Sequence, residues 1–331
     1  MRASRALGIL AGTTAVALAT LFVASPASAA TIAPGQKISV IDRYQEQSPA
    51  NGPFYTVNPA DALATRVGTP SGAETTGVDV NDDGLGYAIG FSDFGSGTSV
   101  TTLWKADANT GTLTEAKPLM YGFADYPQAC LGIDLNPVTG ELLVSCYHVG
   151  PDDVGGVSTI NTVNTATGAL TPIVSLSGNQ FSRFFALALN PVTGVLWAFG
   201  VDTISASYTI DRDLATSSFV AELDEAVYGA DFDRNGQLFV ASERYDGTEF
   251  TFPALGVLDP NTGAFSFLEW MVDTATDTAL ISVGALTVWG RLAATGAPAS
   301  ELLPVGLGSA LLLLAGAAFV ATARVGRRRS A

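Results

Sequence analysis

Histidine and cysteine, on which many active sites depend, are almost absent from this chain of 331 residues. It contains one histidine, His148, and two cysteines. A single histidine excludes a zinc site that needs several imidazole ligands, and no nucleophile stands in a recognisable pattern with it. We therefore expect His148 to be a structural or surface residue near the end of a strand. The sequence also singles out no pair of carboxylates of the kind that glycosidases use.

Positive charge is scarce between residues 31 and 291, the segment that remains when the two ends of the chain are set aside. This segment contains ten lysines and arginines and thirty aspartates and glutamates, a net charge of −20. Nucleic acid and anionic lipid surfaces would be repelled by such a domain. The charge therefore predicts no nucleic-acid partner. It is compatible with a divalent cation, but it does not specify a ligand.

The N-terminus has the order of features found in a secretory signal peptide. Arg2 and Arg5 precede an apolar run over residues 7–23, and Pro26 is followed by small residues up to Ala30. This order of a basic region, an apolar region and a small-residue cleavage site predicts a removable signal peptide over residues 1–30. The alternative is a permanent N-terminal membrane anchor, against which the helix-breaking Pro26 argues.

A second apolar segment lies near the C-terminus. Residues 302–323 contain no charge, and these 22 residues are enough to cross a bilayer core of about 30 Å as a helix. Arginines at 324, 327, 328 and 329 follow, and basic clusters stay on the cytoplasmic side of a membrane. The pattern predicts a transmembrane helix with the bulk of the chain outside the cell.

A short motif stands directly before this apolar segment. It consists of Leu292, Ala293, Ala294, Thr295 and Gly296. With the apolar stretch and the arginine tail that follow, it resembles the cell-wall sorting signal of sortase substrates, in the LAxTG variant typical of high-GC actinobacteria. The resemblance covers residues 292–331 only. It implies a sortase and the peptidoglycan as partners, with sortase attack at the carbonyl of Thr295 and a cell-wall location.

Two features of this motif leave room for other interpretations. Ala293 stands where the commoner LPxTG form has proline, so the class of sortase stays open. The alternative to wall anchoring is a plain membrane protein with a single span. The order of motif, apolar segment and basic tail favours the sorting signal over that alternative.

The two cysteines form a candidate disulfide. An exported protein meets an oxidising environment, which favours a disulfide over a redox pair. Cys130 and Cys146 flank a turn at residues 136–140 at equal distances, so an antiparallel hairpin centred there would place them opposite one another. We predict a cross-strand disulfide, and two free buried thiols are the alternative.

A repeat becomes visible when residues 31–291 are aligned on their turns. An apolar strand that ends in a tight turn occurs four times, at residues 77–81, 132–136, 186–190 and 229–233. About 25 to 30 residues after each first turn comes a second turn of the form Asx-x-x-Thr-Gly, at residues 107–111, 164–168 and 259–263, with a degenerate copy at 211–215. Each unit thus contains four strands, as a β-propeller blade does.

The two ends of the segment supply a fifth unit. Residues 36–44 resemble a second strand and residues 54–59 a third, but no first strand precedes them. Residues 282–288 resemble a spare first strand at the other end of the segment. We therefore predict an all-β fold, a five-bladed propeller over residues 31–291 closed by strands from both ends, without an open blade edge.

Two turns match the first half of a calcium-binding loop, in which alternate oxygen ligands converge on the cation. Their candidate ligands are Asp79, Asn81 and Asp83 in one turn and Asp231, Asp233 and Asn235 in the other. Neither turn has the glutamate expected at the twelfth position, and hairpin turns select the same residue types. Turn chemistry is the favoured interpretation, and no cofactor other than Ca²⁺ is indicated.

Three functions fit these observations. The first is a surface-anchored binding or adhesion module that presents a propeller face to a glycan or protein ligand. The second is a surface-anchored hydrolase or lyase that acts on carbohydrate through carboxylates of the central channel, an idea that rests on fold analogy. The third is a structural component of the cell wall.

Overall fold

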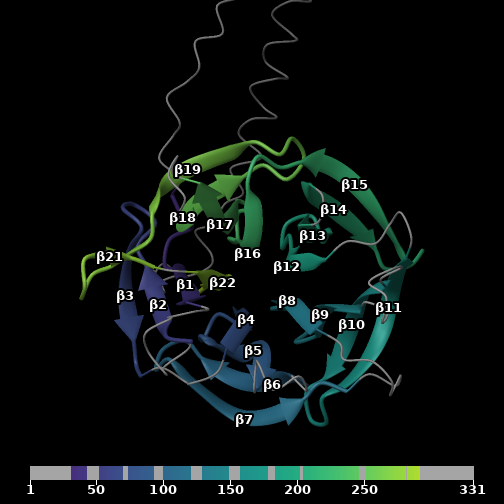
Figure 1. The fold of residues 1–331 in the computed structure, drawn as a ribbon. Coiled ribbons are helices and arrows are strands. Elements are labelled where there is room, and N and C mark those ends of the chain that lie inside the picture. Colours follow the sequence, from purple (N-terminus) through teal and green to yellow (C-terminus); the bar gives the residue numbers. More distant parts are fainter. Residues whose placement is uncertain are drawn as a thin grey trace, which may run out of the picture.

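The computed structural model describes residues 31–42, 52–69, 74–92, 100–120, 129–148, 157–177, 183–201, 204–245, 251–280 and 282–290. These residues form strands and turns and contain no helix. Five sheets, antiparallel except for one short parallel pair at the edge of one of them, stand like blades around one axis, with their first strands innermost (Figure 1). The predicted all-β, five-bladed propeller is confirmed.

Four blades follow one another along the chain, and each is a meander of four strands. Blade 1 contains β4 (Glu74–Val80), β5 (Leu85–Ser92), β6 (Val100–Asp107) and β7 (Thr112–Pro118). Blade 2 contains β8 (Ala129–Leu135), β9 (Leu142–His148), β10 (Val157–Asn164) and β11 (Ala169–Ser177). Blade 3 contains β12 (Phe184–Leu189), β13 (Leu196–Val201), β14 (Ser205–Asp211) and β15 (Thr216–Glu222). Blade 4 contains β16 (Ala226–Phe232), β17 (Leu238–Tyr245), β18 (Thr251–Leu258) and β19 (Phe265–Trp270).

Blade 5 is built from both ends of the described chain. Its strands are β22 (Val283–Trp289), β1 (Lys37–Asp42), β2 (Phe54–Val57) and β3 (Leu63–Val67). β22 is the innermost strand and pairs antiparallel with β1, so that Lys37 lies opposite Trp289. The predicted closure of the ring is therefore confirmed, and Figure 1 shows β1 and β22 side by side.

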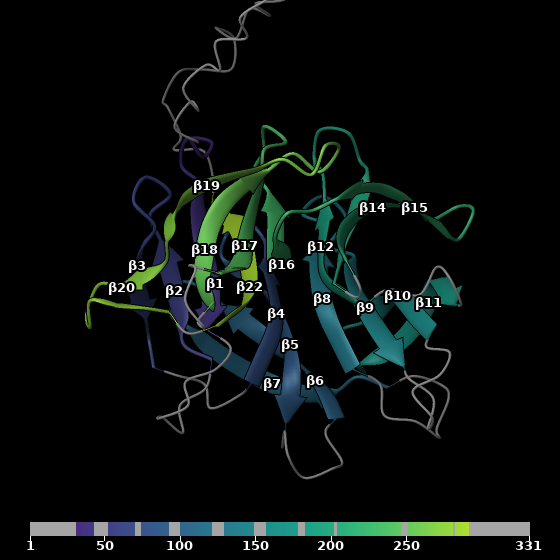
Figure 2. The ribbon, with the colours of Figure 1, turned by 45° about the horizontal axis from the view of Figure 1, so that its top comes forward.

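The sequence pattern did not reveal a two-stranded extension of blade 5. β20 (Val272–Asp273) pairs parallel with β3, and β21 (Thr278–Ala279) pairs with β20 (Figure 2). The buried Asp273 accepts a hydrogen bond from the hydroxyl of Tyr55 at 3.2 Å. These strands are two residues long, too short to produce a detectable alternation of apolar and polar residues.

Asparagine and aspartate side chains close the turns within the blades. In the first turn of blade 2, Asn136 Oδ1 accepts hydrogen bonds from the backbone N–H groups of Val138 and Thr139. Gly140 ends this turn with a φ of 73°. In the second turn of blade 4, the carboxylate of Asp259 accepts from the N–H of Asn261. The predicted turn chemistry thus holds in both kinds of turn.

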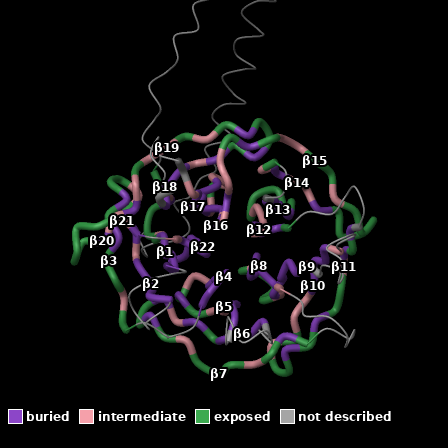
Figure 3. The backbone as a smooth tube through the Cα atoms, in the orientation of Figure 1, coloured by how far each residue is buried: buried purple, intermediate pink, exposed green. Residues whose placement is uncertain are grey.

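The apolar core is divided among the interfaces between blades. The described buried residues form five clusters, and each cluster joins two neighbouring blades. Phe232, Leu238 and Val240, which the sequence places on one face, belong to the cluster between blades 3 and 4. Burial decreases from the innermost strands to the outermost, as Figure 3 shows, and every residue of β4 and β22 is buried. Apolar burial between sheets is therefore the main attraction that holds the ring together.

The two cysteines form the predicted disulfide. Cys130 of β8 and Cys146 of β9 are opposite one another in the ladder and are bonded. The bond crosses from the first to the second strand of blade 2 and is buried. His148 is the last residue of β9, which agrees with its predicted place at a strand end.

Both predicted addressing segments lie outside the described residues. These are the signal peptide at 1–30 and the sorting signal at 292–331 with its transmembrane segment 302–323. Within the part of the chain that the structure describes, no helix is long and apolar enough to cross a membrane.

Candidate functional site in the central channel

One position of the innermost strand recurs around the central channel. It is occupied by Asp79 in β4, Asp134 in β8, Ala188 in β12, Asp231 in β16 and Thr287 in β22. Asp79, Asp134 and Asp231 line one small cavity of about 80 Å³ in the channel. The acids of three blades, far apart in sequence, therefore converge on the axis of the ring.

Each of these side chains except Ala188 bonds to the next blade. Asp79 Oδ2 accepts from the N–H of Leu135, and Asp134 Oδ1 accepts from the N–H of Leu189 at 2.8 Å. Asp231 Oδ2 accepts from the N–H of Val288 at 2.6 Å. In every case the donor is the residue that follows the equivalent position in the next blade. The carboxylates thus link neighbouring innermost strands.

Thr287 completes this set from the blade that closes the ring. Its hydroxyl lies 2.7 Å from Asp79 Oδ1 and 3.3 Å from Asp231 Oδ2. The same oxygen is 3.4 Å from the N–H of Val80 in blade 1. A single hydroxyl therefore joins two carboxyl groups that belong to the blades on either side of blade 5.

Burial changes the acidity of the three aspartates. Loss of solvent around Asp79, together with the nearby charge of Asp134, raises its pKa to about 8. Burial raises the pKa of Asp134 to about 6. Burial and the charge of Asp79 also raise the pKa of Asp231 well above its ordinary value. Near neutral pH the channel therefore retains protons on carboxyl groups that would be ionised in water.

One end of the channel carries the first turns of blades 1–4, and we call this end the turn face. Here Arg234 forms an ion pair with Asp82, with 2.6 Å between Nη2 and Oδ2. The guanidinium also donates to the carbonyl of Gly290 at 2.6 Å, and the backbone N–H of Arg234 donates to Gln36 Oε1 at 3.0 Å. Arg234 thus connects the first turns of blades 1 and 4 to Gln36 and Gly290, which lie at the two ends of the described segment.

At the opposite end of the channel, which we call the loop face, two aromatic side chains are in contact. Phe185 and Tyr228 stack edge to face with their ring centroids 5.1 Å apart. The space they line measures about 10 Å³, the volume of about one water molecule. The guanidinium of Arg183 lies nearby in sequence and covers the ring of Tyr147 at 5.3 Å.

The six candidate calcium ligands do not converge on a common point. Asp79 and Asp231 bond inside the channel, as described above. Asn81 Oδ1 instead accepts from the N–H groups of Asp83 and Leu85. Asp233 likewise accepts from the N–H groups of Asn235 and Gln237, and its other oxygen accepts from the N–H of Ala33.

β4 ends at Val80 and β16 ends at Phe232, so the first candidate ligand of each turn belongs to a strand and the other two belong to the turn that follows it. Among the described residues no three histidine, cysteine or acidic side chains are arranged to hold a metal ion. The bonds are those that the turn interpretation predicts, and calcium binding stays an untested prediction.

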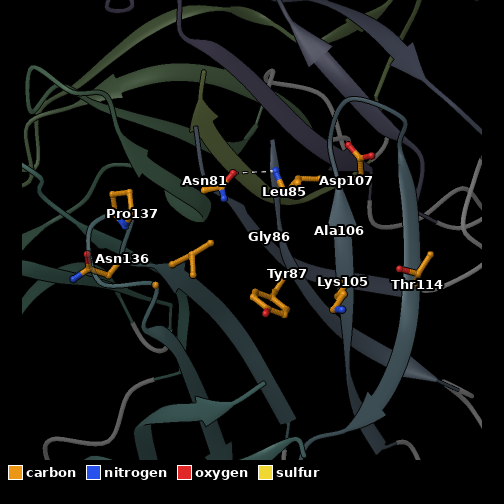
Figure 4. A pocket seen from close by; sticks show the side chains of 12 residues that line it. Asn81, Leu85, Gly86, Tyr87, Lys105, Ala106, Asp107, Thr114, Asn136 and Pro137 are labelled. Atoms are coloured by element: carbon orange, nitrogen blue, oxygen red, sulfur yellow. Dashed lines mark hydrogen bonds between the residues drawn. The ribbon is translucent and has the colours of Figure 1, made fainter. Parts of the chain in front are cut away.

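Two wider grooves lie between blades. One, about 470 Å³ in volume, runs between β5–β7 of blade 1 and the first turn of blade 2. Figure 4 shows Tyr87 and Lys105 on one side of this groove and Asn136 and Pro137 on the other. A second groove of about 470 Å³ lies between the first turn of blade 3 and the strands of blade 4. Both grooves are open and shallow, and neither contains the channel aspartates.

No protein-family model matches the sequence, and no curated protein matches it. Solved structures of similar shape include a putative 6-phosphogluconolactonase from Bacteroides fragilis, with 11% identity and a TM-score of 0.40 over 77% of this chain and 98% of that one. TolB from Acinetobacter baumannii has 13% identity and a TM-score of 0.41 over 71% and 52%. An exo-β-1,3-galactanase from Phanerochaete chrysosporium has 11% identity and a TM-score of 0.39 over 54% and 47%. Similarities this distant say nothing about an activity of this chain.

Proposed function

We propose that this chain is an exported β-propeller, attached covalently to the cell wall, that acts as a binding or adhesion module at the cell surface. The observation that carries the proposal is the order of signals at residues 292–329, a sorting motif followed by an apolar segment and an arginine cluster. The Cys130–Cys146 disulfide supports export, because disulfides persist in oxidising compartments and are rare in the cytosol.

The size of the channel favours binding over hydrolysis of carbohydrate. Acids do converge there, as the hydrolase hypothesis requires. However, the cavity that they line is about 80 Å³, whereas ligand pockets usually measure about 300–1,000 Å³. Each aspartate is also bonded to a backbone N–H of the next blade, so the carboxylates already have a structural role. We therefore expect ligands to bind on the surface of the propeller and not inside the central channel.

Cell fractionation tests the location. The mature protein should be released by enzymes that digest peptidoglycan and should resist extraction by detergent alone. Replacement of Thr295 by alanine removes the residue at which a sortase would cleave, so the T295A variant should appear in the membrane fraction or the medium. Extraction of the unmodified protein by detergent alone would contradict wall anchoring.

Binding and turnover separate the remaining possibilities. Protein released from the wall should bind glycans or surface proteins in an array, without turnover on a panel of polysaccharides. Turnover that is abolished by Asp134→Asn would favour the hydrolase or lyase. Absence of both binding and turnover would leave a structural wall component.

A further inference from the structure

The chain leaves the ring where the other blades have a turn. In blades 1–4 a tight turn joins the innermost strand to the second strand. In blade 5 these strands are β22 and β1, and the connection is replaced by the two ends of the described chain. A Cβ atom added to Gly290 would lie 2.5 Å from the carbonyl oxygen of Gly35, so the two ends are in close contact.

The exit point is therefore on the turn face and near its centre. β22 lines the channel, and its last residues are bonded at the channel mouth, where Arg234 donates to the carbonyl of Gly290. Gln36, at the other chain end, lines the same mouth cavity as Arg234 and Asp82. These hydrogen bonds hold Gln36 and Gly290, at the two ends of the described segment, against the mouth of the channel.

The sorting motif begins almost at once after this exit. Thr295 is the fifth residue after Gly290. Five extended residues span at most about 17 Å, which is less than the width of a folded domain. A covalent bond at Thr295 would therefore hold the centre of the turn face close to the wall.

We infer from this geometry that the turn face is the surface that lies against the peptidoglycan, and that the loop face is the surface presented to partners outside the cell. The inference rests on the proposed wall anchoring and assigns an orientation to it. The wall polymer occupies the turn face, including the mouths of the channel and of the inter-blade grooves. A macromolecular partner then has access to the loop face and its surroundings.

Two variants of the full chain, each with one cysteine added to the disulfide-bonded pair, test this orientation on intact cells. Val138, 89% exposed in the first turn of blade 2, reports on the turn face. Asp224, exposed in the connection between β15 and β16, reports on the loop face. The N–H of the neighbouring Leu223 bonds to Ser205, the first residue of β14, which places this connection at the end opposite to the first turns.

Each variant, Val138→Cys and Asp224→Cys, is treated with a small maleimide and with a maleimide carried by a protein. On intact cells we expect the small reagent to label both positions and the bulky reagent to label only the cysteine at 224. After release from the wall by peptidoglycan digestion, both reagents should label both positions. Equal labelling of the two positions by the bulky reagent on intact cells would overturn the inference.

A spacer variant and a location control make the result specific. A flexible spacer of about 40 residues after Arg291, with a mean end-to-end length of about 35 Å, should restore bulky labelling at position 138. If it does not, something other than the short tether covers the turn face, and the inference fails. If the unmodified chain is not released by peptidoglycan digestion, the proposed anchoring itself fails, which fractionation detects before any labelling.

Discussion

The pKa values of aspartates in the channel and in the outer turns are shifted in opposite directions, because the surroundings of the two groups differ. In the channel, burial raises the pKa of Asp79 to about 8, although backbone N–H groups donate to it. In the outer turns, slight burial opposes ionisation of Asp107, but hydrogen bonds from Asn109 and Thr110 prevail and lower its pKa. Asp259 has the same balance. Aspartate thus links blades in the channel, where its pKa is raised, and closes turns at the rim, where its pKa is lowered.

The contacts between blades differ in the same two places. Along the channel, side chains bond to the backbone of the next blade. At the outer rim, backbone meets backbone, because a Cβ atom at Gly111, Gly168 or Gly263 would overlap a carbonyl oxygen at the end of the preceding blade. The glycine of the Asx-x-x-Thr-Gly turn therefore has two roles, a positive φ and close packing against a neighbour.

The largest effect is expected from a methyl group at the rim. Gly111→Ala combines an unfavourable positive φ with overlap of the carbonyl of Val67, and should lower the free energy of unfolding by about 2–5 kcal/mol. Gly140→Ala is the matched control, because Gly140 has φ 73° but nothing within 4 Å of an added Cβ. Chemical denaturation of both variants measures the difference, and equal losses would refute the packing role.

The next effect is expected at the hydroxyl that joins two channel aspartates. Thr287→Val keeps the shape but removes the donor to Asp79 and Asp231, and should cost about 1–3 kcal/mol. Thr287→Ser retains the hydroxyl and should lose much less. The comparison is made by chemical denaturation near pH 7. A valine variant as stable as the unmodified protein would show that the hydrogen bonds of the hydroxyl contribute nothing.

These opposite pKa shifts predict that the two groups of aspartates change the stability of the protein with pH in opposite directions. The folded channel binds protons more tightly than the unfolded chain, so stability should fall as pH rises from about 5 to 8, a range that lies between the ordinary aspartate pKa of 3.8 and the pKa of Asp79, about 8. Asp79→Asn should flatten this slope in thermal unfolding. Asp107, whose pKa is lowered, contributes stability above its unfolded pKa and loses it as pH falls through the folded value.

The variant Asp107→Asn therefore serves as the control for this experiment. It should lower thermal stability by a constant amount above about pH 4, remove the share of Asp107 in the loss of stability below that pH, and leave the slope between pH 5 and 8 as it is. A wild-type midpoint temperature that is constant from pH 5 to 8 would show that the channel acids are not protonated in the folded state.

The smallest effect is expected at the one outer turn of blades 1–4 that lacks glycine. Ala215 occupies the position in blade 3 with φ 52°, a conformation that costs an L-residue about 1–2 kcal/mol. Ala215→Gly removes this cost but makes the unfolded chain more flexible, so a net gain of up to about 1 kcal/mol should appear in denaturation curves. A loss of stability would show that the methyl group of Ala215 packs favourably.

The blade architecture was predictable because its signals are local. Asx and glycine residues recur at each turn, and residues 282–288 were identifiable as a strand without a partner. The contacts among the channel residues were not predictable from the sequence. Asp79 and Asn81 are two residues apart in a pattern typical of a cation loop, and only the structure shows that Asp79 bonds to the next blade whereas Asn81 closes its own turn. Thr287 gave no signal, since a threonine in a strand is ordinary.

The glycines of the outer turns show the same limit. Turn chemistry predicts Gly111 from its own neighbours. Its contact with Val67 joins two blades and depends on the twist of the sheets, which no spacing in the sequence reveals. Sequence therefore predicts what a residue does within its own hairpin, and the structure adds what it does to the neighbouring blade.

The closure of the ring by β22 determines when blade 5 can finish folding. Trp289 donates to the hydroxyl of Ser39, a residue 250 positions earlier. A chain that crosses a membrane N-terminus first delivers β1–β3 at the beginning and their innermost strand at the very end. Contacts of such large sequence separation form late in folding. If the chain is exported and anchored as proposed, blade 5 is completed just before residues 292–296 emerge. The last step of folding and the attachment to the wall would then be separated by only a few residues of export.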